Sequence, residues 1–328
     1  DGNDVTDQFA VSTRPGSLVI SKRSVTLASA DAQKIYDGDP LTTADMENFG
    51  IVVGGDGFAE GEGAEYVLTG SRTLTGTSEN SFEYTLASGT NEADYDITQV
   101  FGTLTVSARG SDELYSIDVR VDDAEFTYDG QEHAPESISG LTVYIGGHIY
   151  TLSGLEPGGA ERNAGVYEIG ASGTAVVTDE DGNDVTDQFS VNITPGTLTI
   201  HRRDITFRSA SVSKEYDGDP LTAPDVEIVS GGFAEGEGAD ISVTGTRTIP
   251  GSSENTYDIT LWDNTDAANY NITKETGIIT ISSRDVRYEI ILEANSLADM
   301  YDGTEKAVSG IKQDTFTVGG NIFTVEGV

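Results

Sequence analysis

The sequence predicts a mainly β protein made of small domains in tandem. Three observations support this prediction. The tripeptide Tyr-Asp-Gly occurs four times at intervals of roughly 85–95 residues, beginning at Tyr36, Tyr128, Tyr216 and Tyr301. Short segments such as 103–106 and 197–200 alternate between polar and apolar residues, which is typical of half-buried strands. The 39 glycines among 328 residues exceed the usual share and favour many tight turns.

Longer identities divide the repeats into two types. Type A repeats share YDGDPLT, at 36–42 and 216–222, and GFAEGEGA, at 57–64 and 232–239. Each repeat is large enough for a modest core without help from disulfides or metal. We expect each domain to be either a β-grasp-like or an Ig-like sandwich, and the sequence leaves both topologies open.

Type B repeats are plainer. They have Tyr-Asp-Gly without the Pro-Leu-Thr, and a Gly-Gly pair follows at 146–147 and at 319–320. The complete type B copy closes with DGNDVTDQF at 181–189, and the same nine residues open the chain. The two types alternate along the sequence.

We therefore divide the chain into five segments. In order, they are the C-terminal strands of an incomplete type B repeat (1–21), a type A repeat (22–108), a type B repeat (109–201), a type A repeat (202–283) and the N-terminal half of an incomplete type B repeat (284–328). Because 1–21 lacks the start of its repeat, we expect it to pair with the sheet of an adjacent copy or to be poorly ordered. Helix signals are faint, and only 43–48 is expected to form one or two turns, with Thr43 as the cap.

The links between repeats are short and basic. They contain Lys22-Arg23, Arg109, Arg202-Arg203 and Arg284, and none is rich in Gly, Ser or Pro. Such links limit hinge motion, so we expect an extended, fairly stiff rod. Basic residues can flank strands by chance, but we expect these to neutralise acidic neighbours across the interface between repeats.

The Tyr-Asp-Gly motif has the chemistry of a turn. An Asp carboxylate accepts from nearby backbone N–H groups, and Gly tolerates a positive φ. The Tyr is expected to end a strand, bury its ring and keep its hydroxyl in water. The alternative is that exposed tyrosines form stacking platforms for sugars. The motif residues are Tyr36, Asp37, Gly38, Tyr128, Asp129, Gly130, Tyr216, Asp217, Gly218, Tyr301, Asp302 and Gly303.

Several motifs together resemble a known repeat family. They are Lys-x-Tyr-Asp-Gly-x-Pro-Leu-Thr at 34–42 and 214–222, Thr-Gly-Ser-Arg-Thr at 69–73, an Asn-Tyr-x-Ile closure and Gly-x-Leu-Thr-Val/Ile. They resemble the YDG and MBG ("mostly β-grasp") repeats of large bacterial surface proteins and adhesins. The resemblance covers nearly the whole chain and is looser for type B. It implies an extracellular, cell-anchored array with a mainly β fold, and it implies no ligand.

Composition excludes several function classes. The net charge of −38, from 56 acidic and 18 basic residues, disfavours binding to nucleic acid and to anionic membrane surfaces. The absence of cysteine excludes disulfides, thiolate metal sites and a cysteine nucleophile. No apolar run is long enough to span a membrane, and the nucleotide-binding and serine-hydrolase glycine motifs are missing. We therefore expect no enzymatic activity and no cofactor.

One acidic loop suggests Ca²⁺ binding. Its candidate ligands are Asp179, Asp181, Asn183, Asp184 and Asp187. An EF-hand needs Gly at its sixth position, where this loop has Asp184, so that pattern fails. The sequence favours a hairpin turn here and leaves a non-EF cation site as the alternative.

These features favour a non-catalytic stalk of a bacterial cell-surface adhesin, in which neighbouring repeats are one another's partners. A first alternative is a binding module for host glycans or matrix proteins. Its weak ligand-binding candidate is Trp262, the single tryptophan, which stands where the other type A repeat has Ala87. Simple burial in a strand is the favoured interpretation of Trp262. A second alternative is a region of an extracellular filament, assembled through sheet edges.

Overall fold

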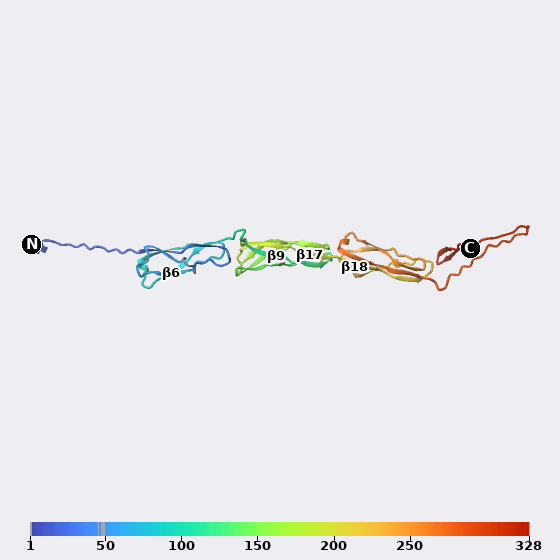
Figure 1. Cartoon of the computed structure of the whole chain (residues 1–328), viewed down its shortest axis with the longest axis horizontal. Helices are drawn as coiled ribbons and strands as arrows, with labels where there is room; N and C mark the ends of the chain where they lie inside the picture. Colours follow the sequence, from blue (N-terminus) through green and yellow to red (C-terminus); the bar gives the residue numbers. More distant parts are fainter. Residues whose placement is uncertain (1, 45, 47–49, 328) are drawn as a thin grey trace. The chain divides into compact units, whose positions relative to one another are not determined.

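The structure is a computed structural model that describes residues 2–44, 46 and 50–327. Within that range the chain forms 27 strands and four 3-10 turns of three residues each. The prediction of a mainly β protein is therefore confirmed (Figure 1). The expected helical turn at 43–48 falls mostly outside the described residues.

The chain divides into two compact units. The first comprises Asp1–Val119, Gly140–Leu155 and Gly173–Asn192, and the second comprises Arg120–Ser139, Glu156–Ser172 and Ile193–Val328. Each unit is described by itself below. Strands β9 (Tyr115–Val121), β13 (His148–Pro157), β15 (Ala171–Thr178) and β16 (Phe189–Thr194) contribute residues to both.

The first unit contains a set of three small sheets. In the first sheet, β1 (Arg23–Ala28) pairs antiparallel with β3 (Val52–Gly55) and parallel with β7 (Tyr95–Val100). In the second, β8 (Gly102–Ser107) pairs parallel with β2 (Ala32–Ile35) and antiparallel with β5 (Gly76–Asn80). The third is the antiparallel pair β4 (Ala64–Leu68) and β6 (Phe82–Leu86).

Alternating side chains hold these sheets together. Val25 and Leu27 of β1 are fully buried, whereas β1 begins with exposed residues. They form a core with Phe82 and Tyr95, and the half-buried Tyr66 of β4 packs against it. Because strand side chains alternate between faces, polar threonines can occupy the other side of the same strands.

The second unit contains the same set again. The sheet orders are β20-β18-β24, β19-β25-β22 and β21-β23, matching β3-β1-β7, β2-β8-β5 and β4-β6 position by position. The strands are β18 (Arg203–Ser209), β19 (Val212–Glu215), β20 (Val226–Gly231), β21 (Ala239–Val243), β22 (Gly251–Asn255), β23 (Tyr257–Leu261), β24 (Tyr270–Glu275) and β25 (Gly277–Ser282). Segments with shared sequence motifs thus have the same pairing.

The remaining strands form four sheets. The second unit holds β10-β17-β14, from β10 (Ala124–Thr127), β17 (Gly196–His201) and β14 (Gly165–Ile169). Here too the strand before Tyr-Asp-Gly runs parallel to a later strand, since β10 is parallel to β17. Two further orders are β11-β9-β16 and β12-β13-β15, with β11 (Ile138–Ser139) and β12 (Thr142–Ile145). The fourth sheet is the hairpin β26 (Thr315–Val318) and β27 (Asn321–Thr324).

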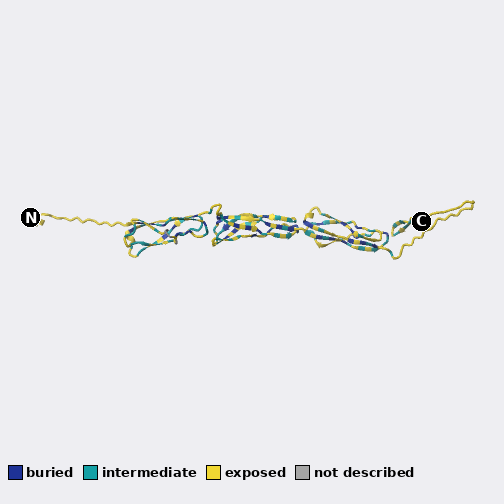
Figure 2. Ribbon diagram, in the orientation of Figure 1, coloured by how far each residue is buried: buried dark blue, intermediate teal, exposed yellow. Residues whose placement is uncertain are grey.

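Residues 2–21 differ from their sequence counterpart. They contain the 3-10 turn η1 (Thr6–Gln8), no strand, and only exposed residues (Figure 2). The nonapeptide DGNDVTDQF makes the comparison direct, because Phe9 is 67% exposed and Phe189 is 6% exposed. Phe189 packs against Tyr115 and Tyr150, with ring centroids 5.6 and 4.8 Å away. Identical sequence is therefore buried only where partner strands cover it.

Candidate interaction site at the Tyr-Asp-Gly motifs

The first three Tyr-Asp-Gly motifs lie at the ends of their repeats. Each follows a short strand, β2, β10 or β19, that runs parallel to the last strand of the same repeat. The Tyr N–H continues the ladder, as Tyr36 N donates to Ser107 O at 2.9 Å and Tyr128 N to His201 O at 2.9 Å. Because the strands are parallel, the motif lies beside the point where the chain leaves the repeat. We call this end the exit face.

All four motifs have the same turn geometry. The Asp carboxylate accepts the N–H two residues later, at 3.0 Å from Asp39 to Asp37 and 2.8 Å from Gln131 to Asp129. The glycines have φ between +83° and +94°, a conformation that favours Gly. In the type A repeats a lysine joins the turn, since Lys214 Nζ lies 2.7 Å from Asp217 Oδ1. That lysine holds the pKa of Asp217 below its usual range.

An arginine of the following repeat contacts each of these three exit faces. Arg109 Nη1 donates to the carbonyl oxygen of Tyr36 at 2.9 Å. Arg203 Nη1 and Arg284 Nη1 donate in the same way to the carbonyls of Tyr128 and Tyr216, at 3.4 and 3.3 Å. A planar guanidinium has several N–H groups, so it can donate to the tyrosine carbonyl and to a second acceptor at the same time.

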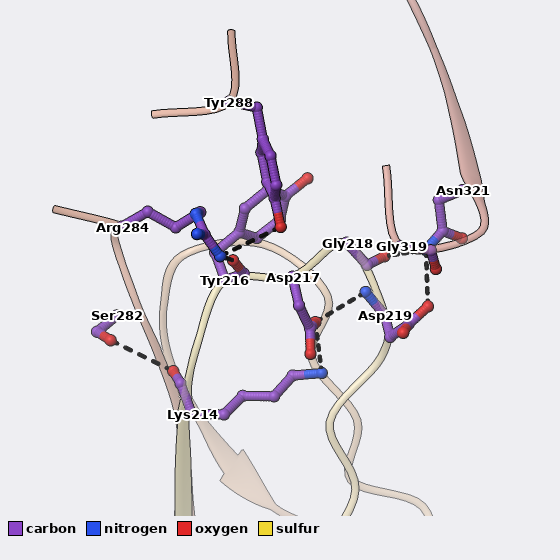
Figure 3. Close-up of polar contacts among 10 residues, drawn as sticks. All are labelled: Lys214, Tyr216, Asp217, Gly218, Asp219, Ser282, Arg284, Tyr288, Gly319 and Asn321. Carbon is purple, nitrogen blue, oxygen red and sulfur yellow. Dashed lines mark hydrogen bonds and ion pairs between the residues drawn. The ribbon is translucent and has the colours of Figure 1, made fainter. Parts of the chain in front are cut away.

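These arginines also use neighbours within their own repeat. The guanidinium of Arg109 lies 3.9 Å from the ring centroid of Tyr115, so it stacks on an aromatic face. The guanidinium of Arg284 does the same at 4.4 Å from the ring centroid of Tyr288 (Figure 3). Among the described residues, none of these three arginines lies within 4 Å of a carboxylate. For these three arginines the prediction that they neutralise acidic neighbours is therefore wrong, because their partners are backbone carbonyls and, for Arg109 and Arg284, tyrosine rings. Of the other link residues, Lys22 lies 3.8 Å from Asp96, a carboxylate of its own repeat.

The tyrosine side chains also depart from expectation. Tyr36 and Tyr128 are buried including their hydroxyl ends, so the prediction of a hydroxyl in water is wrong for them. Burial is the main cause that raises the pKa of both phenols. Tyr216 is half-buried, and Tyr301 is 95% exposed. A motif with uniform turn chemistry thus occurs in different environments.

In the second unit, GFAEGEGA receives the exit face that contains Tyr128. The Tyr128 hydroxyl donates to Glu237 Oε1, and the Tyr270 hydroxyl donates to Glu237 Oε2 at 2.7 Å. The rings of Tyr128 and Tyr270 meet edge to face at 5.4 Å. Ala234 N fixes Tyr270 by donating to its hydroxyl oxygen at 2.9 Å. We call this surface of a type A repeat its receiving face.

Asn269 completes the same receiving face. Its buried side chain accepts from Ala164 N at 2.8 Å and donates to Asn163 Oδ1 at 3.1 Å. A cavity of about 370 Å³ beside it is lined by Tyr128, Arg162, Glu235, Glu237 and Asn269, among others. A buried amide with both groups paired is typical of a specific contact.

Type B repeats receive an exit face differently. In the first unit, His148 Nε2 lies 3.2 Å from Asp39 Oδ1. In the second unit, Asn321 Nδ2 donates to Asp219 Oδ1 at 2.8 Å and to Gly218 O at 2.7 Å (Figure 3). At the second hairpin, glycine permits a close approach, since a Cβ at Gly319 would lie 2.3 Å from Asp217 O. A Cβ at the equivalent Gly146 would lie 3.6 Å from Asp37 O, which is an ordinary contact.

Sequence reasoning missed the receiving faces. It treated GFAEGEGA and Gly-Gly-His/Asn only as marks of repeat type. The available signal was the alternation of the two repeat types, which places each of these segments in a repeat next to one of the other type.

The acidic loop is closed by its own backbone. Asp179 Oδ1 accepts from Asp181 N at 3.0 Å and from Asn183 N at 2.8 Å, and Gly182 has φ +81°. Asp184 Oδ1 accepts from Thr186 N at 3.0 Å, while Asp187 is exposed. In the part of the chain that the structure describes, no three acidic or histidine side chains are grouped as a metal site would require.

Trp262 lies just after β23, and its backbone N–H donates at 3.0 Å to the carbonyl oxygen of Gly238, a residue of GFAEGEGA. Its side chain is 46% exposed, and Nε1 donates to Asp240 Oδ1 at 3.2 Å. The indole covers Gly238, where a Cβ would lie 2.7 Å from the ring. It is therefore partly available to solvent.

A scan against protein-family models found no match to the chain, and a search of curated proteins found no similar sequence. No helix among the described residues has the length and apolar character needed to cross a membrane.

Proposed function

We propose that this chain is a non-catalytic structural array of alternating type A and type B repeats, acting as a stalk on a bacterial cell surface. In this proposal each Tyr-Asp-Gly exit face docks on the receiving face of the next repeat, and successive docking produces an extended, stiff rod. Each repeat in this array is a small β domain, either β-grasp-like or an Ig-like sandwich.

One recurrent contact carries the proposal. At three successive links, an arginine of the following repeat donates to the carbonyl of the Tyr in Tyr-Asp-Gly. Links that were simple tethers would not need the same contact at each step. The surface location rests on the resemblance to adhesin repeats, and the acidic, cysteine-free composition is compatible with it.

Small-angle X-ray scattering of the full chain tests the proposal. We compare wild type with a triple variant, Arg109→Ala, Arg203→Ala and Arg284→Ala. A matched control, Arg14→Ala, Arg120→Ala and Arg208→Ala, removes the same charge away from the links. We expect a long, narrow particle for wild type and control, and a shorter average dimension with signs of flexibility for the triple variant. Equal profiles for all three proteins would contradict the role of the links.

The half-exposed indole of Trp262 favours a second candidate, a binding module for glycans. Aromatic faces bind sugar rings through apolar contact, and Asp240 offers an acceptor beside the ring. Glycan-array binding that is lost in Trp262→Ala and kept in Tyr144→Ala would support it. If wild type and both variants fail to bind any glycan, the stalk is the only candidate function that stands.

A further inference from the structure

We propose that two copies of this chain join head to tail. In this joint, the Tyr301-Asp302-Gly303 turn of one copy docks on the receiving face of the first type A repeat (22–108) of the other. The inference rests on the proposed docking of exit faces on receiving faces, and it adds a partner, a second copy of the chain. The structure contains both halves of the joint separately, and the second unit contains the same pair already docked.

The receiving face of the first type A repeat is already built. The Tyr95 hydroxyl donates to Glu62 Oε2, and Ala59 N donates to that hydroxyl oxygen at 3.0 Å. Arg23 Nε donates to the carbonyl oxygen of Gly57 at 2.9 Å. The second type A repeat has the same contacts, made by Tyr270, Glu237, Ala234, Arg203 and Gly232. The face can therefore take a Tyr-Asp-Gly turn without rearranging.

A cavity marks the place where that turn would lie. It has a volume of about 220 Å³, and its lining includes Arg23, Ala59, Glu62 and Tyr95. In the second type A repeat, the counterparts of these four residues all contact the turn that begins at Tyr128. Glu237 accepts from the Tyr128 hydroxyl, Tyr270 meets its ring at 5.4 Å, and Arg203 donates to its carbonyl at 3.4 Å. The fourth, Ala234, has its Cβ 3.2 Å from a Cβ built on Gly130.

The turn at 301–303 is the other half of the joint. Asp302 Oδ1 accepts from Thr304 N at 3.0 Å, and Gly303 has φ +83°, as Gly130 also has. The Tyr301 side chain is almost fully exposed, and a Cβ built on Gly303 would meet nothing within 4 Å. The turn is therefore formed but uncovered.

Residues 16–21 supply a strand for the same joint. They align with β17 through the shared DGNDVTDQF, and Ile20 lines the cavity of the receiving face. Leu18 and Ile20 are 88% and 87% exposed, whereas their counterparts Leu198 and Ile200 in β17 are 0% and 2% exposed. Apolar side chains in this pattern gain stability when neighbouring strands cover them.

Residues 288–301 of the second copy supply the covering strands. They align with 115–128, which contains β9 and β10, and β10 runs parallel to β17. Ile290 and Leu292 are exposed, whereas the two residues at their positions in β9 are buried. Addition of a strand in the register of β10 along β17 would bring Tyr301 to the receiving face, as it brings Tyr128 in the second unit.

The joint is smaller than a complete type B repeat, so it should open reversibly. Neither segment has a counterpart of β14 or β15, and Asp299 stands where β10 has Phe126. The net charge of −38 on each copy opposes association. Because the joint is built from apolar side chains and hydrogen bonds, added salt should strengthen it by screening that repulsion.

Sedimentation velocity of the full chain over a wide range of protein concentration tests the joint. At about 0.15 M salt, which screens charges beyond about 8 Å, we expect the mean mass of wild type to rise with concentration. Tyr301→Phe removes only the hydroxyl that would donate to Glu62, and it should weaken association about tenfold or more. Tyr144→Phe, at an exposed tyrosine outside the joint, should associate like wild type.

Two blocked variants test whether the joint is head to tail. Leu18→Asp/Ile20→Asp blocks the receiving half, and Tyr301→Asp blocks the exit half by bringing a carboxylate toward Glu62. These three positions are exposed, so the monomers should fold like wild type. Each blocked variant alone should stay monomeric. An equal mixture should stop at the dimer, because only one intact joint can then form.

A matched control carries two added charges on the outward side of the same segments. Val19→Asp/Ile291→Asp alters exposed residues whose counterparts in the complete type B repeat, Thr199 and Asp118, are not buried. This variant should assemble like wild type. The joint would be overturned by a wild type that stays monomeric throughout, by association that persists in both blocked variants, or by an equal loss in the control.

Hydrogen exchange at the Ala164 amide separates failure of the joint from failure of the proposed function. This N–H donates to Asn269 Oδ1 at 2.8 Å within the second unit, so its protection reports docking of one repeat on the next. A protected amide in a chain that stays monomeric would overturn the joint alone. An unprotected amide would overturn docking between repeats, and with it both proposals.

Discussion

The hydroxyl of Tyr128 donates to the carboxylate of Glu237, which stands 109 residues later in the chain. The same carboxylate accepts from Tyr270 at 2.7 Å, so one glutamate joins a Tyr-Asp-Gly tyrosine to a tyrosine of the next repeat. Tyr128 is therefore more than a turn residue: its backbone is part of the turn, and its side chain makes a hydrogen bond to the next repeat.

Removing that hydroxyl should weaken the second unit. Tyr128→Phe keeps the ring and its edge-to-face contact but removes one of the two hydroxyls that donate to the Glu237 carboxylate. We expect a loss of about 1.5–3 kcal/mol in the free energy of unfolding, the usual range for a hydrogen bond to a charged group. Urea unfolding measures it. Tyr144→Phe, at an exposed tyrosine, is the control, and equal stability of the two variants would show that the bond contributes nothing.

Alkaline pH should destabilise the links. Burial raises the pKa of Tyr36, Tyr128 and Tyr270 above the value of an unfolded tyrosine, which is about 10. A raised pKa in the folded state contributes stability that is complete below pH 10 and is lost as the pH rises toward the folded pKa, because the unfolded chain then releases protons that the folded chain retains. Urea unfolding at increasing pH should show stability falling from about pH 10 upward. An unchanged stability across that range would contradict the burial of these phenols.

The glycine of the motif should matter most where a neighbour approaches it. At Gly38 (φ +93°) an added Cβ would lie 2.6 Å from His148 Cδ2 and from the Tyr150 hydroxyl, whereas at Gly303 (φ +83°) it would meet nothing within 4 Å. Both Ala variants bear the same left-handed strain of about 1–2 kcal/mol. Gly38→Ala should lose at least about 1 kcal/mol more in thermal unfolding because of overpacking. Equal losses would mean that the link opens freely.

Arg109 should not be replaceable by lysine. Its Nε donates to Glu113 O at 2.5 Å while Nη1 donates to Tyr36 O, and its plane stacks on Tyr115. Lysine can reproduce neither the fork nor the stacking. Arg109→Lys should cost about 1–2 kcal/mol in the stability of the first unit. Arg120→Lys, at an exposed residue paired with Asp123, should be nearly neutral, and a similar cost for both would point to charge alone.

The loop at 179–187 should depend on its own hydrogen bonds. Asp179→Ala removes the acceptor for two backbone N–H groups and should lower the unfolding midpoint, whereas Asp187→Ala should not. Added Ca²⁺ should leave the wild-type midpoint unchanged, since only a ligand that binds the folded state raises it. A midpoint that rises with Ca²⁺ and does so less in Asp179→Ala would establish the cation site instead.

The sequence was sufficient for the local features and insufficient for the long-range ones. Alternation at 103–106 and 197–200 predicts strands, and β8 and β17 lie there, because period-two patterning reflects burial on one face. The partner of the Tyr128 hydroxyl could not be predicted, because local turn chemistry says nothing about a carboxylate more than a hundred residues away.

The arginines show why composition misled. Because the chain has 56 acidic residues, a carboxylate is the partner that composition predicts for Arg109. The pairing of the parallel strands instead places the carbonyl oxygen of Tyr36 beside its guanidinium. Phe9 and Phe189 show the same limit, since nine identical residues are exposed in one place and buried in another. Burial depends on which strands are present to cover a segment.

The central claim is that Tyr-Asp-Gly fixes each repeat to the next, and a distance measurement across one link tests it most directly. The chain has no cysteine, so spin labels can be attached at Thr197→Cys in β17 and Asp258→Cys in β23, both exposed positions within the second unit. We expect pulsed electron paramagnetic resonance to give one narrow distribution of distances between the two labels, and we expect this distribution to broaden in Tyr128→Ala. A distribution that is already broad without that substitution would show that the repeats are merely tethered.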